Sequence, residues 1–225
     1  FQAFQDQLSE AGIPAGDVAL ILITHAHPDH AGLANRIKEL TGAQVAMHRL
    51  DALESHSSSD RWSDRDSSRR LTEWYGFPSQ DLDQAFHHGP PSRSGSKQEE
   101  SGYRGVRWES PRVDRRLEGG EELLPGSGLW AVWTPGHTPG HTSIAIASGG
   151  ERGYVLGDVA HFFVQAHYTD WCPIWDVEPE LSRKTRHKVL NMLEAEGILV
   201  SAGHFPDPGF GHFVRGASRR VWQGI

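Results

Sequence analysis

The fold of this chain is decided by the stretch Leu20-Ile21-Leu22-Ile23-Thr24-His25-Ala26-His27-Pro28-Asp29-His30. Its apolar first part predicts a buried β-strand. Directly after that strand come three imidazoles and a carboxylate, all within six residues. Neutral imidazole and carboxylate are ligands that suit zinc and its first-row neighbours, and four of them this close can serve two ions. The stretch therefore predicts a metal site at the end of a strand.

Three later segments repeat this arrangement. They are Thr134-Pro135-Gly136-His137-Thr138-Pro139-Gly140-His141, Tyr154-Val155-Leu156-Gly157-Asp158 and Ile198-Leu199-Val200-Ser201-Ala202-Gly203-His204. In each of them a candidate ligand follows a short β-rich run, at or beyond a glycine. Strand ends that converge on one edge are where a rigid scaffold commonly assembles a site from its loops. We therefore expect these segments to contribute to one centre.

This ordered set of residues resembles the metallo-β-lactamase superfamily, whose sites use a His-x-His-x-Asp-His loop, a later His, a bridging Asp and a last His. The resemblance covers nearly all of residues 18–225. It implies one metal held by His25, His27 and His137, a second held by Asp29, His30 and His204, and Asp158 as the bridge. The tail, residues 202–212, is similar to the branch that contains methyl parathion hydrolases and related lactonases.

The resemblance implies an α/β fold, the αββα sandwich. In that family the metal loop follows an opening set of strands, whereas here it arrives directly after residue 23, so the usual N-terminal strands would be lacking. Hydrophobic periodicity and glycine stops agree with alternating strands and helices. The expected helices cover residues 1–12, 31–40 and 179–196, the expected strands cover 18–23, 44–48, 129–134, 143–147 and 153–156, and a hairpin covers 211–223.

Length and charge limit the classes of function. A chain of 225 residues fits one domain, residues 1–225, and a net charge of -7 argues against a nucleic-acid surface. The apolar runs are far shorter than the roughly 20 residues that span a bilayer, and no signal peptide is visible, so we expect a cytoplasmic protein. The single cysteine, Cys172, excludes an internal disulfide framework. The expected partner is a small-molecule substrate, with a homodimer as a further possibility.

Residues 55–118 differ in composition from the rest of the domain. They include the polar runs Ser55-His56-Ser57-Ser58-Ser59-Asp60 and Gly89-Pro90-Pro91-Ser92-Arg93-Ser94-Gly95-Ser96, which are too polar to supply core. In related enzymes an insertion here caps the substrate pocket. A lid and a solvated excursion are equally compatible with this composition.

The predicted chemistry follows from two divalent metal ions, with Zn²⁺ as the expected metal. A hydroxide that bridges the two ions would be the nucleophile at neutral pH, so no Ser or Cys nucleophile is needed. Asp29 and His161 are the candidate catalytic residues. His161 lies three positions past Asp158, where the quorum-signal lactonases that this chain resembles place a Tyr, and a His at that spacing occurs in the methyl parathion hydrolase branch. His161 is thus either a proton donor or a supporting residue.

The remaining histidines and aromatic residues have simpler expected roles. His141 and His212 would support ligands rather than bind metal. Surface positions are expected for His48, His56, His87, His88, His167 and His187. A pocket lining or a core is expected for Phe162, Phe163, Trp171, Trp175, Phe205 and Phe210. Cys172 is expected to be a buried thiol.

The leading hypothesis is a dinuclear zinc hydrolase of a small ester, lactone or phosphotriester. Its nearest alternative is a thioesterase of the glyoxalase II kind. That family carries a helical C-terminal substrate domain, and since the given sequence ends soon after His204, we expect this alternative less than the leading one. An iron-dependent redox enzyme is a second alternative, since these ligand types also bind iron. A non-catalytic domain that kept the fold is the third, and it need not bind metal at all.

Overall fold

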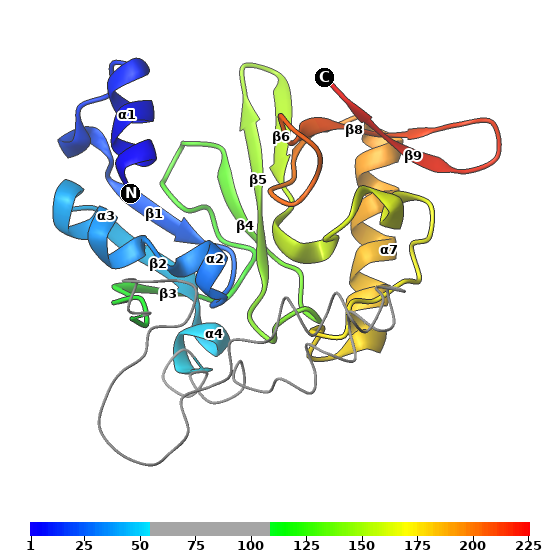
Figure 1. Ribbon diagram of the computed structural model, residues 1–225, viewed down its shortest axis with the longest axis horizontal. Helices are drawn as coiled ribbons and strands as arrows, with labels where there is room; N and C mark the ends of the chain where they lie inside the picture. The colour runs from blue at the N-terminus through cyan, green and yellow to red at the C-terminus, as the bar shows by residue number, and fades with distance from the viewer. Residues whose placement is uncertain (55–108) are drawn as a thin grey trace, which may run out of the picture. The chain divides into compact units, whose positions relative to one another are not determined.

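The computed structural model describes residues 1–54 and 109–225 (Figure 1). Residues 1–56 and 110–225 form one compact unit. The lid predicted for the insertion concerns residues that are mostly outside this description. Among the helices of the described ranges, none is long and apolar enough to cross a membrane.

The smaller sheet carries the first metal loop. Its three parallel strands, in the order β1-β2-β3, are β1 (Leu20–Ile23), β2 (Gln44–His48) and β3 (Arg115–Leu117). The helices of this part are α1 (Gln2–Glu10), the short η1 (Ala15–Asp17), α2 (Pro28–Ala31), α3 (Ala34–Thr41) and α4 (Arg49–Glu54). Because parallel strands need a crossover connection, α2 and α3 return the chain from β1 to β2, and α3 packs against both strands.

The larger sheet carries the other ligand loops. Its six strands follow the order β4-β5-β6-β7-β8-β9 and are β4 (Leu129–Trp133), β5 (Thr142–Ser148), β6 (Glu151–Val155), β7 (Leu199–Ser201), β8 (Phe210–Arg215) and β9 (Arg220–Gly224). Only β6 and β7 pair in parallel, and the chain crosses between them through η3 (Gly157–Val159), η4 (Phe163–Ala166) and α7 (Pro179–Glu196). The other neighbours are antiparallel.

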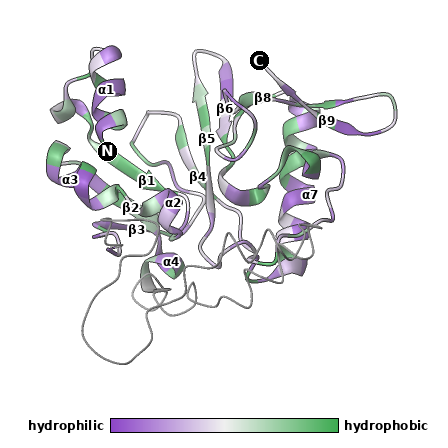
Figure 2. Cartoon of the chain, viewed as in Figure 1, coloured by the Kyte–Doolittle hydropathy of each residue, from purple (hydrophilic) through white to green (hydrophobic). Residues whose placement is uncertain are grey.

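Two apolar layers hold the sheets and helices together. One lies between the sheets, where Ala46 of β2 and Leu117 of β3 pack with Ala131 of β4 and Ile144 of β5. The other lies between the larger sheet and α7, with Val189, Leu190 and Leu193 against Tyr154, Val200 and Phe213. Full burial of a leucine contributes about 1.5–3 kcal/mol. Figure 2 shows green, hydrophobic residues along β1 and along parts of β5 and α7. The layer order helix, sheet, sheet, helix confirms the αββα sandwich.

Most predicted elements are present, with two corrections. The helix expected over residues 31–40 is interrupted, because α2 ends at Ala31 and α3 begins at Ala34. The polar insertion expected over 55–118 cannot extend to 118, since β3 lies inside that range and Leu117 is 1% exposed. The glycine stops are confirmed: Gly42 and Gly197 adopt the left-handed conformation, with φ of 74° and 61°.

Candidate metal centre

The first metal loop is shaped by a strand end and a short helix. His25 follows β1, and His27 lies at the position before α2. Pro28 opens α2, where its fixed φ is already helical and its missing N–H costs nothing. Asp29 and His30 consequently lie in the single turn of α2, on the same loop as the two preceding histidines. The four residues are thus close in sequence because the end of β1 is followed directly by the single turn of α2.

The other ligands come from loops of the larger sheet. His137 lies between β4 and β5, Asp158 lies in η3 after β6, and His204 follows β7. The bend before Asp158 requires Gly157, which has a φ of 58°. A Cβ at this position would lie 2.6 Å from Nε2 of His141, so no other residue fits there. The structure therefore brings all seven predicted ligands together.

Four of these residues form a buried group around one carboxylate oxygen. The members are His25, His27, His137 and Asp158. Oδ2 of Asp158 lies 3.5 Å from Nε2 of His25 and 3.4 Å from Nε2 of His137. Nε2 of His137 lies 3.0 Å from Nδ1 of His27. His25, His137 and Asp158 are at most 1% exposed, so water has little access to this group.

A more exposed group faces the other carboxylate oxygen. Oδ1 of Asp158 lies 3.2 Å from Nε2 of His30 and 3.5 Å from Nε2 of His204. Asp29 completes this group, with Oδ2 3.5 Å from Nε2 of both histidines. The side chains of Asp29 and His204 are 58% and 35% exposed. Asp158 therefore presents one oxygen to each group, as a bridging ligand does.

The buried polar atoms fit a metal ion. Nε2 of His25 is buried and has no hydrogen-bond partner within residues 1–54 and 109–225. Leaving such an atom unpaired costs about 1–3 kcal/mol. Burial, together with the neighbouring histidines, lowers the pKa of His25 well below its usual value and that of His27 to about 3. Both rings are thus neutral near pH 7, as metal ligands must be.

The charge of Asp158 balances this group. Burial acts to raise the pKa of Asp158, but hydrogen bonds from His161, His204 and His30 outweigh it and hold the pKa far below the usual range. The same hydrogen bond to Asp158 raises the pKa of His204, against a smaller effect of burial. An ionised carboxylate beside the neutral imidazoles of His25 and His27 is the combination that suits a divalent ion.

Asp51, which the sequence analysis did not identify, connects two of the metal loops. It lies on α4 and is 1% exposed. Its carboxylate accepts hydrogen bonds from the N–H of Ala26 at 3.1 Å, the hydroxyl of Thr138 at 2.7 Å and the N–H of Gly140 at 2.6 Å. Burial raises the pKa of Asp51, and these hydrogen bonds oppose the rise. Since Ala26 separates two ligands and Thr138 follows a third, Asp51 fixes both loops at once.

His141 contacts the backbone of Asp158 and belongs to neither ligand group. Its Nε2 accepts a hydrogen bond from the N–H of Asp158 at 2.8 Å, and its Nδ1 lies 2.8 Å from the hydroxyl of Thr134. Burial, with the charge of His137, lowers the pKa of His141 to about 3, so the ring is neutral and able to accept this bond. This placement agrees with the supporting role expected from the sequence.

His161 lies beside the carboxylate of Asp158. Its Nε2 is 2.9 Å from Oδ2 of Asp158 and 2.8 Å from Nε1 of Trp175, which donates to it. One nitrogen cannot accept the indole proton and donate to the carboxylate at the same time. Burial lowers the pKa of His161, although Asp158 opposes this effect. Nε2 of His161 thus forms a hydrogen bond with only one of these two partners at a time.

Two other sequence expectations need correction. His48 is not a surface residue: it is 2% exposed, lies 3.0 Å from the carbonyl oxygen of Glu118 and stacks on Trp133. Cys172 is half-buried rather than buried, and its thiol donates to the carbonyl of Pro179. Of the aromatic residues expected in a pocket lining or a core, Phe205 belongs to the core. The exposed ones are Phe162, Phe163, Trp171 and Phe210.

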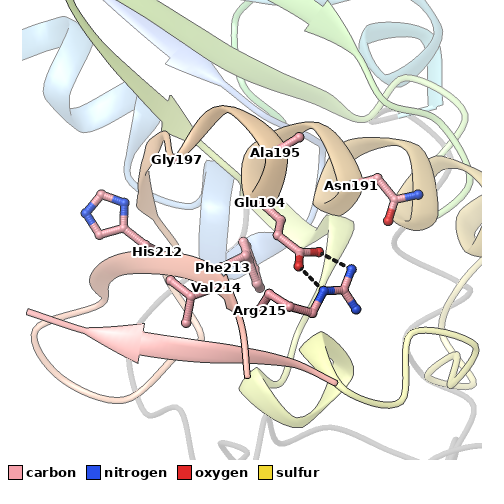
Figure 3. Close-up of a pocket in the computed structure, with 8 residues that line it drawn as sticks. All are labelled: Asn191, Glu194, Ala195, Gly197, His212, Phe213, Val214 and Arg215. Carbon is pink, nitrogen blue, oxygen red and sulfur yellow. Dashed lines mark hydrogen bonds and ion pairs between the residues drawn. The ribbon is translucent and has the colours of Figure 1, made fainter. Parts of the chain in front are cut away.

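His212 lies in a separate pocket that shares no residue with the metal groups. The pocket has a volume of about 640 Å³ and lies between α7 and the β8–β9 hairpin (Figure 3). Glu194 and Arg215 form an ion pair in it, with 2.6 Å between Oε1 and Nε. His212 lies 3.1 Å from the carbonyl oxygen of Ile198 through Nδ1. It is therefore a structural residue in the described part of the chain.

Comparisons with known proteins agree with this geometry. The model of the metallo-beta-lactamase superfamily matches residues 1–204. An N-acyl homoserine lactonase from Bacillus thuringiensis is 30% identical over 88 residues, which are 39% of this chain and 34% of the lactonase. A homologous lactonase from Bacillus cereus matches to the same extent. The match thus spans about a third of the length of these curated relatives.

Solved structures share the fold. The hydrolase AbOPH of the beta-lactamase superfamily superposes with a TM-score of 0.64 and 23% identity, covering 98% of this chain and 68% of that one. AidC, a dizinc quorum-quenching lactonase in complex with the product N-hexanoyl-L-homoserine, superposes with a TM-score of 0.66 and 22% identity, with the same coverage. At these identities the superpositions establish the architecture.

Proposed function

This chain belongs to the metallo-beta-lactamase superfamily, and on that premise we propose that it hydrolyses a small ester, lactone or phosphotriester at a centre of two divalent metal ions. The observation that carries the proposal is the position of Asp158, whose two oxygens face two different ligand groups. A carboxylate placed in this way can hold two ions at the separation of about 3.5–4 Å that two-metal hydrolases use.

The ligand types indicate which ions the centre would hold. His25, His27 and His137 would bind one ion and Asp29, His30 and His204 the other, with Asp158 shared. Imidazole and carboxylate ligands favour zinc, and iron or manganese remain compatible with them. When bound, the two ions would supply a nucleophile at neutral pH and stabilise the negative charge that develops on the substrate.

The residues around the centre would handle the proton and the leaving group. His161 lies against Asp158 and, when its ring is protonated, would deliver a proton to the oxygen that leaves the acyl or phosphoryl centre. Trp175 holds the His161 ring in place through the indole N–H. Beyond His161, the ring of Phe162 is 38% exposed and offers an apolar surface for the substrate.

The names of the lactonase relatives support lactones as the first substrate candidates to test. The names of the curated relatives refer to N-acyl homoserine lactones, cyclic esters with an apolar acyl chain. A lactone needs a nucleophile, a stabilised oxyanion and a proton for the ring oxygen, which are the three functions proposed here. Phosphotriesters and aryl esters make the same demands, and a thioester differs mainly in its leaving group.

The first test is the metal content of protein purified without chelator. We expect about two zinc equivalents per chain and hydrolysis of a lactone panel that includes N-acyl homoserine lactones. A chelator should remove the metal in two phases, because Asp29 and His204 are exposed whereas His25 and His137 are buried. Activity should disappear with the first phase. A chain that binds iron would instead point to redox chemistry, and one that binds no metal would contradict the proposal.

A second prediction concerns His161. The His161→Phe variant should retain both ions but lose about 10²–10⁴-fold in kcat for substrates with a poor leaving group, since general acid catalysis contributes about that much. The loss should be smaller for aryl esters, whose leaving groups need no proton. His187→Phe is a suitable control, because His187 is exposed and pairs with Asp170. Equal turnover of wild type and His161→Phe on all substrates would remove His161 from the mechanism.

A further inference from the structure

We infer that Arg186 and Asp176 form a buried positioning pair that orients His137 toward the buried ligand group and ties it to the segment that follows Asp158. The inference rests on the proposed function, because positioning a ligand has a consequence only where metal binds. The starting observation is the burial of a charged side chain on α7. Arg186 is 0% exposed, although α7 is rich in charged residues.

All five N–H groups of Arg186 meet an acceptor oxygen. Nε donates to the carbonyl of Val159 at 2.7 Å, Nη1 to the carbonyls of Thr169 at 3.0 Å and Trp171 at 2.7 Å, and Nη2 to Oδ2 of Asp176 at 3.2 Å and the hydroxyl of Ser182 at 2.9 Å. A guanidinium has five donors, so this one is fully satisfied. A buried cation is tolerated only with such complete pairing, and removing one partner is costly.

Asp176 connects Arg186 to His137, one of the candidate metal ligands. Its Oδ1 lies 2.9 Å from Nδ1 of His137, while its Oδ2 accepts from Arg186. A carboxylate at Nδ1 selects the tautomer that carries the proton there, which leaves the lone pair on Nε2. Nε2 of His137 is the nitrogen that lies 3.4 Å from Oδ2 of Asp158. Asp176 thus sets both the tautomer and the direction of this ligand.

Arg186 also contacts the segment that carries Asp158. Arg186 donates to the carbonyl of Val159, the residue directly after Asp158. The backbone around His137 is also bound near the start of α7, where the N–H of Val177 donates to the carbonyl of His137 at 3.0 Å. Arg186 therefore connects two ligand-bearing loops of the buried group. Among the residues that the structure describes, neither Arg186 nor Asp176 forms a hydrogen bond with Asp29, His30 or His204.

Asp176 could alternatively be a metal ligand, since it lies in a group with His137 and His161. The charge beside it argues against that role. Arg186 places a full positive charge 3.2 Å from Oδ2, where it would repel a divalent ion. Oδ1 is already engaged by His137. A carboxylate with both oxygens occupied is a positioning group.

The test compares zinc affinities of the two ions in wild type and in Asp176→Asn, by competition with a chromophoric chelator at a temperature where both are folded. We expect one of the two ions to bind about 10–100-fold more weakly and the other to change less than about threefold. With saturating zinc, kcat should fall while KM changes little. Asp170→Asn is the matched control, since Asp170 is exposed and pairs only at the surface with His187.

The outcomes separate this inference from the proposed function. A wild-type chain that binds no zinc overturns both. Wild type with two ions, and Asp176→Asn with unchanged affinities or with both ions equally weakened, overturns the inference alone, because a purely structural residue has no preference for one ion. If Asp176→Asn does not fold, Ser182→Ala removes a single bond of the network and should weaken the same ion by about two- to tenfold.

Discussion

Replacement of Asp158 by alanine is expected to lower hydrolysis by at least about 10³-fold and to weaken both metal ions together. A factor of 10³ corresponds to about 4 kcal/mol, in the range of the charge stabilisation that bound metals supply. The reason is geometric, because Oδ2 faces His25 and His137 whereas Oδ1 faces His30 and His204. Metal content by elemental analysis and turnover of a lactone would measure the two effects.

Asp29→Ala provides the contrast for this prediction. Asp29 lies only in the exposed ligand group, with Oδ2 3.5 Å from Nε2 of His30 and of His204. We therefore expect Asp29→Ala to lose one ion and to retain the buried one. Two tightly bound ions in Asp158→Ala would show that the centre is built in another way. Loss of both ions in Asp29→Ala would show that the two groups are not separate sites.

Asp51→Ala is expected to cost about 3–5 kcal/mol of unfolding free energy, measured on metal-free protein. The substitution leaves three donors, on Ala26, Thr138 and Gly140, without their buried acceptor, and each such loss costs about 1–3 kcal/mol before any relief by entering water. For a chain of this size the midpoint of thermal unfolding should fall by about 6–20 °C. Calorimetry or circular dichroism would measure the change.

The same variant should also bind zinc less tightly, because the loops that carry His25 and His137 would no longer be held together. Asp17→Ala is the control, since Asp17 is an exposed carboxylate in η1 and its replacement should change stability by about 0.5 kcal/mol or less. A melting temperature of Asp51→Ala within about 2 °C of wild type would contradict the assigned role.

The candidate metal ligands were predictable because each carries a local signal. His25 and His27 follow an apolar run that predicts a strand, and Asp29 and His30 lie in the helical turn that comes next. The glycine stop at Gly197 and the periodicity of α7 likewise depend on neighbours in sequence. Resemblance to the family then connected distant segments that periodicity alone could not connect.

The supporting residues had no such signal. Asp51 contacts residues 25 and 87 or more positions away, and in sequence it looks like any charged residue of a short helix. Arg186 stands among Arg183, Lys184 and Lys188, a pattern typical of a solvated face. The short strand β3, Arg115–Leu117, could not be predicted either, because two of its three residues are arginines. A charged side chain is buried when hydrogen-bond partners from distant parts of the chain surround it. The spacing of residues in the sequence does not reveal those partners.

The sequence, together with its resemblance to the family, therefore determined the class of fold, the order of the strand ends and the seven candidate ligands, because these depend on residue type, short spacing and the order of motifs along the chain. Only the tertiary structure decided which oxygen of Asp158 faces which of the two expected groups, which candidate ligands are buried, and which residues hold them. The physical reason is that hydrogen bonds and desolvation act between atoms that the folded chain brings within about 3 Å, whatever their separation in sequence.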